Sequence, residues 1–244
     1  MVLVTGASAG IGAAVAAELA ARGAVVLAAG RDPAATERVA ERTGAHALVA
    51  DLTDPDAPSA LAARAVNEHG RVDALVASAG MGWRGSLAEM PVDTLDQLIA
   101  LNLRAPLVLS RALLPGMLAR GRGHVMLLAS IAGLTGVASE SVYAATKAGL
   151  VVFAESLRLE IAGSGVGVGV VSPGAVATGF FDRRGAPYDR RFPRPIRPAL
   201  VARTVVDAIE RDRTDVVLPR WLGVAPRVRA LAPRTYRRLA RRLG

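Results

Sequence analysis

The strongest constraint on the fold is a regular alternation of short apolar runs and helical segments. Six runs of strand length lie at residues 2–5, 24–29, 45–50, 73–77, 123–129 and 166–171, each followed by glycine, aspartate or serine. Strands that alternate with helices predict a parallel, doubly wound α/β sheet whose ligand crevice follows the carboxyl ends of the strands. A helix at about 198–211 and a seventh strand at 215–218 should complete this sheet.

The turn after the first run is rich in glycine and precedes an amphipathic helix that ends near Arg22. A strand, a Gly-rich turn, a helix and a second strand form the first half of a dinucleotide-binding unit. The glycine spacing here is Gly-x-x-x-Gly-x-Gly. Its glycines let the backbone approach a pyrophosphate, which the helix N-terminus attracts. The residues expected to bind the cofactor here are Gly6, Ser8, Gly10, Ile11 and Gly12.

The ends of the second and third strands carry charged residues. Arg31 follows the second strand, where an arginine accommodates a 2′-phosphate, so we expect NADP(H), with NAD(H) possible. The alternative is a solvated arginine in a loop. Asp32 is placed to cap the next helix before Pro33. Asp51, followed by Leu52, could accept a hydrogen bond from an adenine amino group or cap the following helix.

Three residues between 130 and 147 suggest acid–base chemistry. Ser130 sits at the carboxyl end of the fifth strand, and Tyr143 and Lys147 share one helix face at a spacing of four. A neighbouring ammonium favours the phenolate and should lower the pKa of Tyr143. Lys147 is the only lysine in a chain that otherwise uses arginine, which cannot replace a compact ammonium. The alternative is a chance survivor on a solvated helix face.

Further small or polar residues lie near the same predicted edge. Asn102, in the apolar helical segment 91–119, is either a member of a structural hydrogen-bond network or part of a proton path. Ala79 and Gly80 follow the fourth strand and let the backbone pass close to a cofactor. The rigid turn after the sixth strand includes Pro173, Gly174, Val176 and Thr178.

Taken in order, these motifs resemble the short-chain dehydrogenase/reductase (SDR) family of NAD(P)-dependent oxidoreductases over about residues 1–180. The resemblance rests on Thr5-Gly6-x-x-x-Gly10-x-Gly12, Asp51, Ser78-Ala79-Gly80, Asn102, Ser130, Tyr143-x-x-x-Lys147 and Pro173-Gly174-x-x-x-Thr178. It implies a single Rossmann-type domain and a catalytic tetrad of Asn102, Ser130, Tyr143 and Lys147. The family's turn after strand four is usually Asn-Asn-Ala-Gly, whereas this chain has Ala77-Ser78-Ala79-Gly80, without the side chains that brace it.

The resemblance also implies a reaction, the interconversion of a ketone or aldehyde with an alcohol by hydride transfer. Tyr143 would be the general acid/base, Ser130 would bind the substrate oxygen, and Lys147 would hold the nicotinamide ribose. Asn102 would position a water that relays protons to Lys147. Thr178 and the backbone near Val176 would contact the nicotinamide end. Family members act on small-molecule substrates, and a homodimer or homotetramer is expected.

The last quarter of the chain differs from the rest in charge. Residues 182–244 hold 17 arginines and 6 acidic residues, although the whole chain has a net charge of +9. We expect a catalytic domain over 1–219, with a substrate lid at about 179–200 whose Phe180, Phe181 and Phe192 suggest an apolar pocket wall. Residues 220–244 form a basic amphipathic tail. It could contact a membrane surface or a neighbouring subunit, or close over its own domain.

Composition excludes several other classes of protein. The chain has no cysteine, and its three histidines are scattered, so we expect no metal site. The basic tail lacks a recognised nucleic-acid-binding motif, and the first residues show no basic leader, so we expect a cytoplasmic protein that binds no nucleic acid. Two alternatives on the same fold remain: a non-catalytic NAD(P)-binding regulator and a membrane-surface protein.

Overall fold

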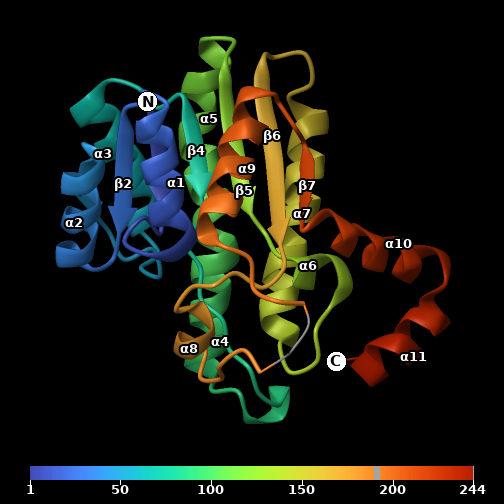
Figure 1. Cartoon of the computed structure of the whole chain (residues 1–244). Helices are drawn as coiled ribbons and strands as arrows, with labels where there is room; N and C mark the ends of the chain where they lie inside the picture. The colour runs from blue at the N-terminus through green and yellow to red at the C-terminus, as the bar shows by residue number, and fades with distance from the viewer. Residues whose placement is uncertain (190–192, 244) are drawn as a thin grey trace.

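The computed structural model describes residues 1–189 and 193–243 and contains one seven-stranded sheet (Figure 1). All neighbouring strands pair in parallel, in the order β3-β2-β1-β4-β5-β6-β7, which confirms the predicted fold class. The strands are β1 (Val2–Thr5), β2 (Val26–Gly30), β3 (His46–Val49), β4 (Ala74–Ala77), β5 (Gly123–Leu128), β6 (Val166–Pro173) and β7 (Asp215–Leu218). Each lies within two residues of its expected position.

Helices cover both faces of this sheet. Figure 1 shows α1 and α9 on one face and α5 and α7 on the other. The helices are α1 (Gly10–Ala21), α2 (Pro33–Thr43), α3 (Ala57–His69), α4 (Val92–Ile99), α5 (Ala105–Ala119), α6 (Ile131–Thr135), α7 (Ser141–Glu160), α8 (Phe180–Arg183), α9 (Pro198–Glu210), α10 (Val224–Leu231) and α11 (Pro233–Leu243). Single turns η1 (Leu87–Glu89) and η3 (Arg220–Gly223) and the π-helical turn η2 (Ala100–Arg104) connect some of them.

The two faces of the sheet have separate apolar cores because strand side chains alternate between them. Leu3 and Leu75 pack with the helices α3, α5 and α7. Val4 and Val76, one residue further along the same strands, pack with α1, α2 and α9. Burial on both faces explains why the strands read as continuous apolar runs.

The longest apolar helical stretch is part of this core. Residues 92–119 comprise α4, η2 and α5, the one stretch among the described residues that is long and apolar enough to cross a membrane. Its Leu109, Leu113 and Met117 are buried against the sheet. We therefore interpret it as a core helix.

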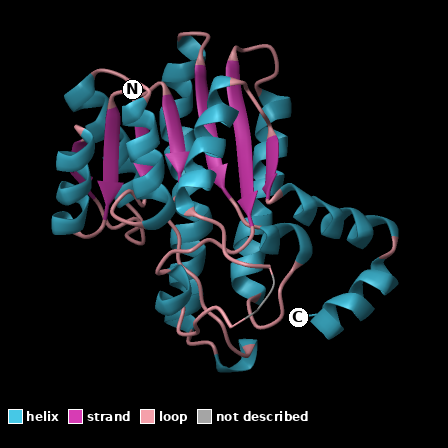
Figure 2. Ribbon diagram, in the orientation of Figure 1, coloured by secondary structure: helices cyan, strands magenta, loops and turns pink. Residues whose placement is uncertain are grey.

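The last residues form an arm beside the carboxyl ends of the strands, where most of the long loops gather (Figure 2). We call η3, α10 and α11, residues 220–243, the C-terminal arm. The sequence predicts an amphipathic helix here, but the structure has two, which are separated at Ala232 and folded back on one another. Pro233 cannot continue α10 because it lacks a backbone N–H, so a new helix begins there.

Candidate active site

A cleft of about 1580 Å³ runs along the carboxyl ends of β1 to β6. It lies at the point where the strand order reverses between β1 and β4, the usual ligand position in such sheets. The cleft brings together these predicted site residues: Gly6, Ser8, Gly10, Ile11, Gly12, Arg31, Asp51, Leu52, Ala79, Gly80, Ser130, Tyr143, Lys147, Pro173, Gly174, Val176 and Thr178. Asn102, the remaining predicted site residue, is fully buried and does not line the cleft.

The Gly-rich turn requires glycine for geometric reasons. Gly6 and Gly10 have φ angles of 65° and 57°, in the left-handed region that favours glycine. A Cβ on Gly12 would lie 2.2 Å from the carbonyl oxygen of Gly6, so the start of α1 packs against the turn. A Cβ on Gly10 would lie 3.3 Å from the Thr178 side chain, so the turns after β1 and β6 are in close contact.

The N-terminus of α1 suits an anionic ligand. Its N-cap is Ala9, and within the described part of the chain no side chain caps the helix and no acidic residue occupies its first turn. The first backbone N–H groups of a helix have no partner within the helix, and the dipole favours negative charge there. This arrangement fits the pyrophosphate of a dinucleotide.

Charged residues occupy the end of the cleft formed by β2 and β3. Asp32 accepts a hydrogen bond from the Ala35 amide at 2.9 Å, which confirms its predicted role as the N-cap of α2. Asp51 accepts hydrogen bonds from Thr53 and does not cap α3, which begins at Ala57. Burial alone would raise the pKa of Asp51, but the Thr53 bonds and the charge of Arg31 hold that pKa below its usual value.

Ser130, Tyr143 and Lys147 meet where β5 ends and α7 begins. Ser130 is the N-cap of α6, and its hydroxyl accepts a hydrogen bond from the Ala132 amide at 3.2 Å. Tyr143 and Lys147 are both buried, and the Lys147 Nζ lies 5.9 Å from the centre of the Tyr143 ring. The ammonium donates a hydrogen bond of 2.9 Å to the carbonyl oxygen of Leu128.

The pKa values of this pair differ from the sequence-based expectation. Burial raises the pKa of Tyr143 to about 12, although a hydrogen bond with Ser130 counteracts part of this increase. Burial also lowers the pKa of Lys147 to about 8. The expected lowering of the tyrosine pKa by Lys147 is therefore not seen, because removal of the phenol from water dominates the pKa of Tyr143.

Asn102 lies in η2, a π-helical turn of the kind that often marks functional sites. Its Oδ1 accepts a hydrogen bond from the Met81 amide at 2.9 Å, and its Nδ2 donates to the Met81 carbonyl oxygen at 2.8 Å. A Cβ on Gly80 would lie 3.1 Å from this Oδ1 and 3.5 Å from the Lys147 Nζ. Asn102 thus holds the loop after β4 next to Lys147.

Thr5 braces the turn that lacks the family's usual asparagines. Its Oγ1 accepts hydrogen bonds of 3.1 Å from the amides of Ser78 and Ala79. A Cβ on Gly6 would lie 2.8 Å from the Cα of Ala79, so this turn and the Gly-rich turn are in close contact. The backbone therefore passes close to the cleft without the asparagine side chains.

Residues of the segment expected to form a lid, about 179–200, make contacts that the sequence did not reveal. The Phe180 ring lies 5.6 Å from that of Tyr143, and the guanidinium of Arg184 forms a buried ion pair with Glu140 just before α7. Glu140, directly before the helix that carries Tyr143, is visible in the sequence as an acidic residue near the site. Its partner Arg184 is 44 positions away, so the sequence could not reveal the pairing. Phe192, which we expected in the pocket wall, lies outside the described residues.

The chain is similar to known proteins of one family. A family model described as short chain dehydrogenase matches residues 1–189. The chain is 35% identical to the ketoacyl reductase HetN of Nostoc sp. over 89% of this chain and 77% of the relative. It is 32% identical to rat dehydrogenase/reductase SDR family member 7B, over 98% of this chain and 79% of the relative.

A solved structure is similar over almost the whole chain. The short-chain dehydrogenase from Sphingobium yanoikuyae in complex with NADPH superimposes with a TM-score of 0.82 at 29% identity. The similarity covers 96% of this chain and 94% of that one.

Proposed function

This chain belongs to the short-chain dehydrogenase/reductase family of oxidoreductases, and from that premise we propose that it uses NADP(H) to interconvert a ketone or aldehyde with an alcohol. The observation that carries the proposal is the meeting of Ser130, Tyr143 and Lys147 on the wall of the cleft that also contains the Gly-rich turn. A proton donor thus lies in the same cleft as a dinucleotide site.

The residues of the cleft fit a nicotinamide dinucleotide. The uncapped start of α1 and the turn from Gly6 to Gly12 would hold the pyrophosphate, and Asp51 would hold the adenine. Ala79 and Gly80 leave room for the backbone to approach the ligand, and Val176 and Thr178 would contact the nicotinamide end. When bound, the nicotinamide supplies or accepts the hydride.

Each catalytic side chain has a distinct task. Tyr143 donates a proton to the carbonyl oxygen during reduction and takes it back during oxidation. Its pKa of about 12 keeps the phenol protonated near neutral pH, the form that a donor needs. Ser130 donates a hydrogen bond to the same oxygen and stabilises its developing negative charge. Lys147 would hold the ribose hydroxyls of the cofactor, and Asn102 would position the water of the proton relay.

Arg31 supports NADP(H) as the cofactor. It is exposed on the cleft, and within the described residues no hydrogen bond or ion pair holds its guanidinium. Asp32, the carboxylate that could select NAD(H), is engaged in capping α2. A free guanidinium at this end of the cleft favours a 2′-phosphate.

The cofactor proposal is tested by titrating NADPH and NADH into Arg31→Ala. A charge-assisted hydrogen bond contributes about 1.5–3 kcal/mol, so we expect about 10- to 100-fold weaker NADPH binding with unchanged NADH binding. Arg38→Ala, an exposed arginine on α2 outside the cleft, is the matched control. Equal effects of both variants would refute the role of Arg31.

The reaction itself is tested by NADPH consumption with a panel of ketones, aldehydes and quinones. We expect turnover with at least one carbonyl class, and its loss in Tyr143→Phe. NADPH binding without turnover of any carbonyl or alcohol would support a non-catalytic cofactor-binding protein instead.

A homo-oligomer in the cytoplasm completes the proposal. Large apolar side chains are exposed on α4, α5 and α7, among them Val92, Val152 and Leu159, which are 65–73% exposed. Such side chains on neighbouring helices favour burial against a second copy of the chain. Light scattering after size exclusion should give a dimer or tetramer, and a monomer at micromolar concentration would contradict this expectation.

A further inference from the structure

A buried ion pair joins the segment after β6 to the helix that carries Tyr143. The guanidinium of Arg184 contacts the carboxylate of Glu140, and the two residues are 7% and 9% exposed. Both line the cleft. Removing two charges from water has a large cost, and a buried ion pair is often no more stabilising than apolar side chains of similar volume. A role besides stability would account for such a pair.

Arg184 lies at the end of a row of aromatic side chains that leads to Tyr143. We call residues 180–188, which contain α8, the α8 segment, and Figure 1 shows α8 near the carboxyl ends of the strands. The Arg184 guanidinium lies 4.6 Å from the centre of the Phe181 ring. The rings of Phe181 and Phe180 are 5.7 Å apart, edge to face, and Phe180 is the ring that lies 5.6 Å from Tyr143. Packed rings thus connect the cation to the proposed proton donor.

Glu140 lies at the start of α7, three residues before Tyr143. Its backbone carbonyl oxygen accepts a hydrogen bond of 2.8 Å from the Ala144 amide, in the first turn of the helix. Within the described part of the chain, its side chain accepts no capping hydrogen bond from α7, and the carboxylate contacts Arg184 instead. The ion pair therefore attaches the α8 segment to the first turn of α7.

The loop after β4 packs against the same contact. A Cβ on Gly82 would lie 2.6 Å from the Phe180 ring and 3.3 Å from the Cβ of Arg184. The Gly85 amide donates a hydrogen bond of 2.9 Å to the carbonyl oxygen of Ser139, just before α7. Three segments thus meet around the ion pair: the loop after β4, the α8 segment and the start of α7.

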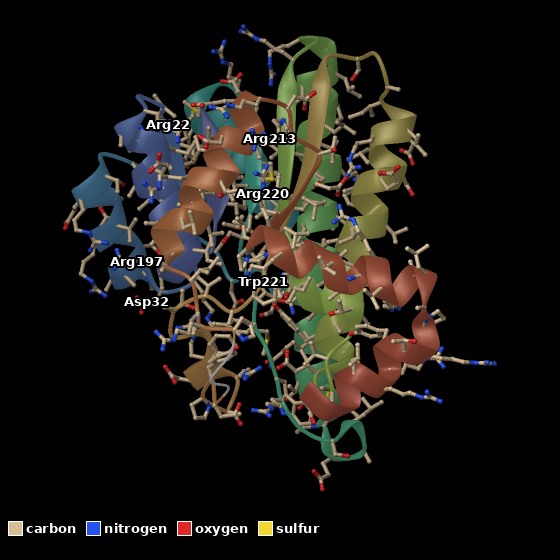
Figure 3. The ribbon with its side chains drawn as sticks, turned by 45° about the vertical axis from the view of Figure 1, so that its right-hand side comes forward. Arg22, Asp32, Arg197, Arg213, Arg220 and Trp221 are labelled. Atoms are coloured by element: carbon tan, nitrogen blue, oxygen red, sulfur yellow. The ribbon has the colours of Figure 1, made fainter. Side chains whose placement is uncertain are left out.

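Arginines at the surface form ion pairs of a different kind. Figure 3 shows Arg22 at the end of α1 that is remote from the cleft, where it contacts Asp207 of α9 at 2.8 Å. Arg158, in the last turn of α7, contacts Asp215 at 3.1 Å, and this carboxylate side chain is 56% exposed. Surface pairs of this kind contribute little to stability. Both arginines lie outside the cleft, so they are suitable controls.

The two buried charges act on Tyr143 in opposite directions. The Glu140 carboxylate raises the pKa of Tyr143 and the Arg184 guanidinium lowers that pKa, besides the larger effects of burial and of the hydrogen bond with Ser130. Paired, the two charges oppose one another at the phenol. Loss of one partner would leave the other charge buried without its counter-ion near the proton donor.

We propose that Glu140 and Arg184 are positioning residues for Tyr143: their ion pair holds the α8 segment against the start of α7 and so fixes the phenol where it meets the substrate carbonyl. This inference rests on the proposed carbonyl chemistry at Tyr143. A misplacement of about 1 Å can cost about 10²-fold in rate, so a fixed phenol matters for kcat. Both residues act through Tyr143 and not on the reacting atoms.

The test is a double-mutant cycle of Glu140→Gln and Arg184→Met, with kcat measured at saturating NADPH and carbonyl substrate. Each single change should lower kcat about 10- to 100-fold, because the phenol is displaced. The double variant should lose no more than the more impaired single variant, because both changes break one contact. Arg158→Met and Arg22→Met are the matched controls and should change kcat less than twofold.

The double variant also keeps the test valid when a single variant does not fold, because it leaves no unpaired charge from this contact. Its kcat should still fall at least tenfold. Losses that multiply in the double variant, or a double variant with the kcat of the wild type, would overturn the inference.

The pH profile separates positioning from a general loosening of the fold. Reduction needs the protonated phenol. Glu140→Gln leaves the guanidinium, which lowers the pKa of Tyr143, so its activity should fall at a lower alkaline pH than that of the wild type. Arg184→Met should not show this shift. An equal proportional loss at every pH in both variants would indicate a purely structural contact and overturn the inference.

Amide exchange of the protein with bound NADPH separates this inference from the proposed function. Arg184→Met should accelerate exchange at residues 183–185 and 144–147, whereas Arg158→Met should not. This pattern without turnover of any carbonyl would overturn the reductase and keep the attachment of the α8 segment. Turnover of a carbonyl, with exchange that Arg184→Met leaves unchanged, would overturn the attachment and leave the reductase standing.

Discussion

The catalytic centre and the C-terminal arm border the same cleft, but they are held in different ways. Tyr143, Lys147 and Asn102 are buried, and backbone carbonyls or amides hold the lysine and the asparagine. Among residues 220–240, no side chain is buried, and two hydrogen bonds to α6 attach the helices. The side chains of the proposed catalytic centre are thus closely packed, whereas the arm is lightly attached and can change at little cost in stability.

The largest effect should come from the packed centre. Tyr143→Phe removes the proton donor and keeps the ring that packs against Phe180. A positioned general acid contributes about 10²- to 10⁴-fold, so we expect kcat/KM to fall by that factor. Steady-state kinetics measure the loss, and an unchanged NADPH dissociation constant serves as the control. A variant with more than a tenth of the original activity would contradict the role of Tyr143.

The buried lysine should have a pH-dependent effect on stability. The pKa of Lys147 lies at about 8 in the fold, below its ordinary value of 10.5. Between these values the unfolded chain binds a proton that the folded protein lacks, so stability rises with pH. The shift of about 2.5 units corresponds to about 3 kcal/mol.

We therefore expect the wild-type protein to gain up to about 3 kcal/mol over Lys147→Met as pH rises from 8 to 10.5. Urea unfolding at several pH values measures this difference, and Tyr143 contributes equally to both proteins. Parallel stability curves for the two proteins would show that Lys147 is not desolvated as the structure indicates.

A smaller loss of stability and activity should follow from adding a side chain between α6 and α7. A Cβ on Gly133 would lie 2.6 Å from the backbone carbonyl carbon of Lys147, so α6 and α7 cross with no room for a side chain. Gly133→Ala should cost about 1–3 kcal/mol of stability and lower kcat by displacing α7. Gly116→Ala on α5 is the matched control, because its Cβ meets just the flexible end of Arg120. Similar unfolding midpoints for both variants would refute this tight crossing.

The smallest effect on stability belongs to the arm. Tyr236→Phe removes one hydrogen bond to the Thr135 carbonyl oxygen. We expect global unfolding to change by less than about 1 kcal/mol, since the net value of such a bond is small. Amide exchange in α11 should become faster, whereas exchange in α7 should not change. Equal acceleration in both helices would remove the distinction between arm and centre.

The sequence predicts the sheet and most of the cleft well for a physical reason. Strands buried on both faces must be apolar throughout, so their positions are visible as runs such as residues 123–129. Positions at the carboxyl ends follow from the topology once the strands are known. That is why residues as distant as Gly6 and Thr178 could be assigned to one cleft before the structure was known.

Interactions that depend on distant partners could not be predicted in this way. The pairing of Glu140 with Arg184 and the bracing of Ser78 by Thr5 join segments far apart in the chain. The raised pKa of Tyr143 depends on complete burial, which spacing alone does not reveal. The amphipathic pattern of residues 220–244 left open whether the apolar face meets a membrane, a subunit or the protein itself.

The central claim is that Tyr143 and Lys147 face a nicotinamide ring at the carboxyl end of β5. A crystal structure of the protein with NADPH tests this claim most directly. We expect the pyrophosphate at the start of α1, the 2′-phosphate beside Arg31, and the nicotinamide next to the Tyr143 hydroxyl. A dinucleotide bound with its nicotinamide away from Tyr143 and Lys147 would contradict the account.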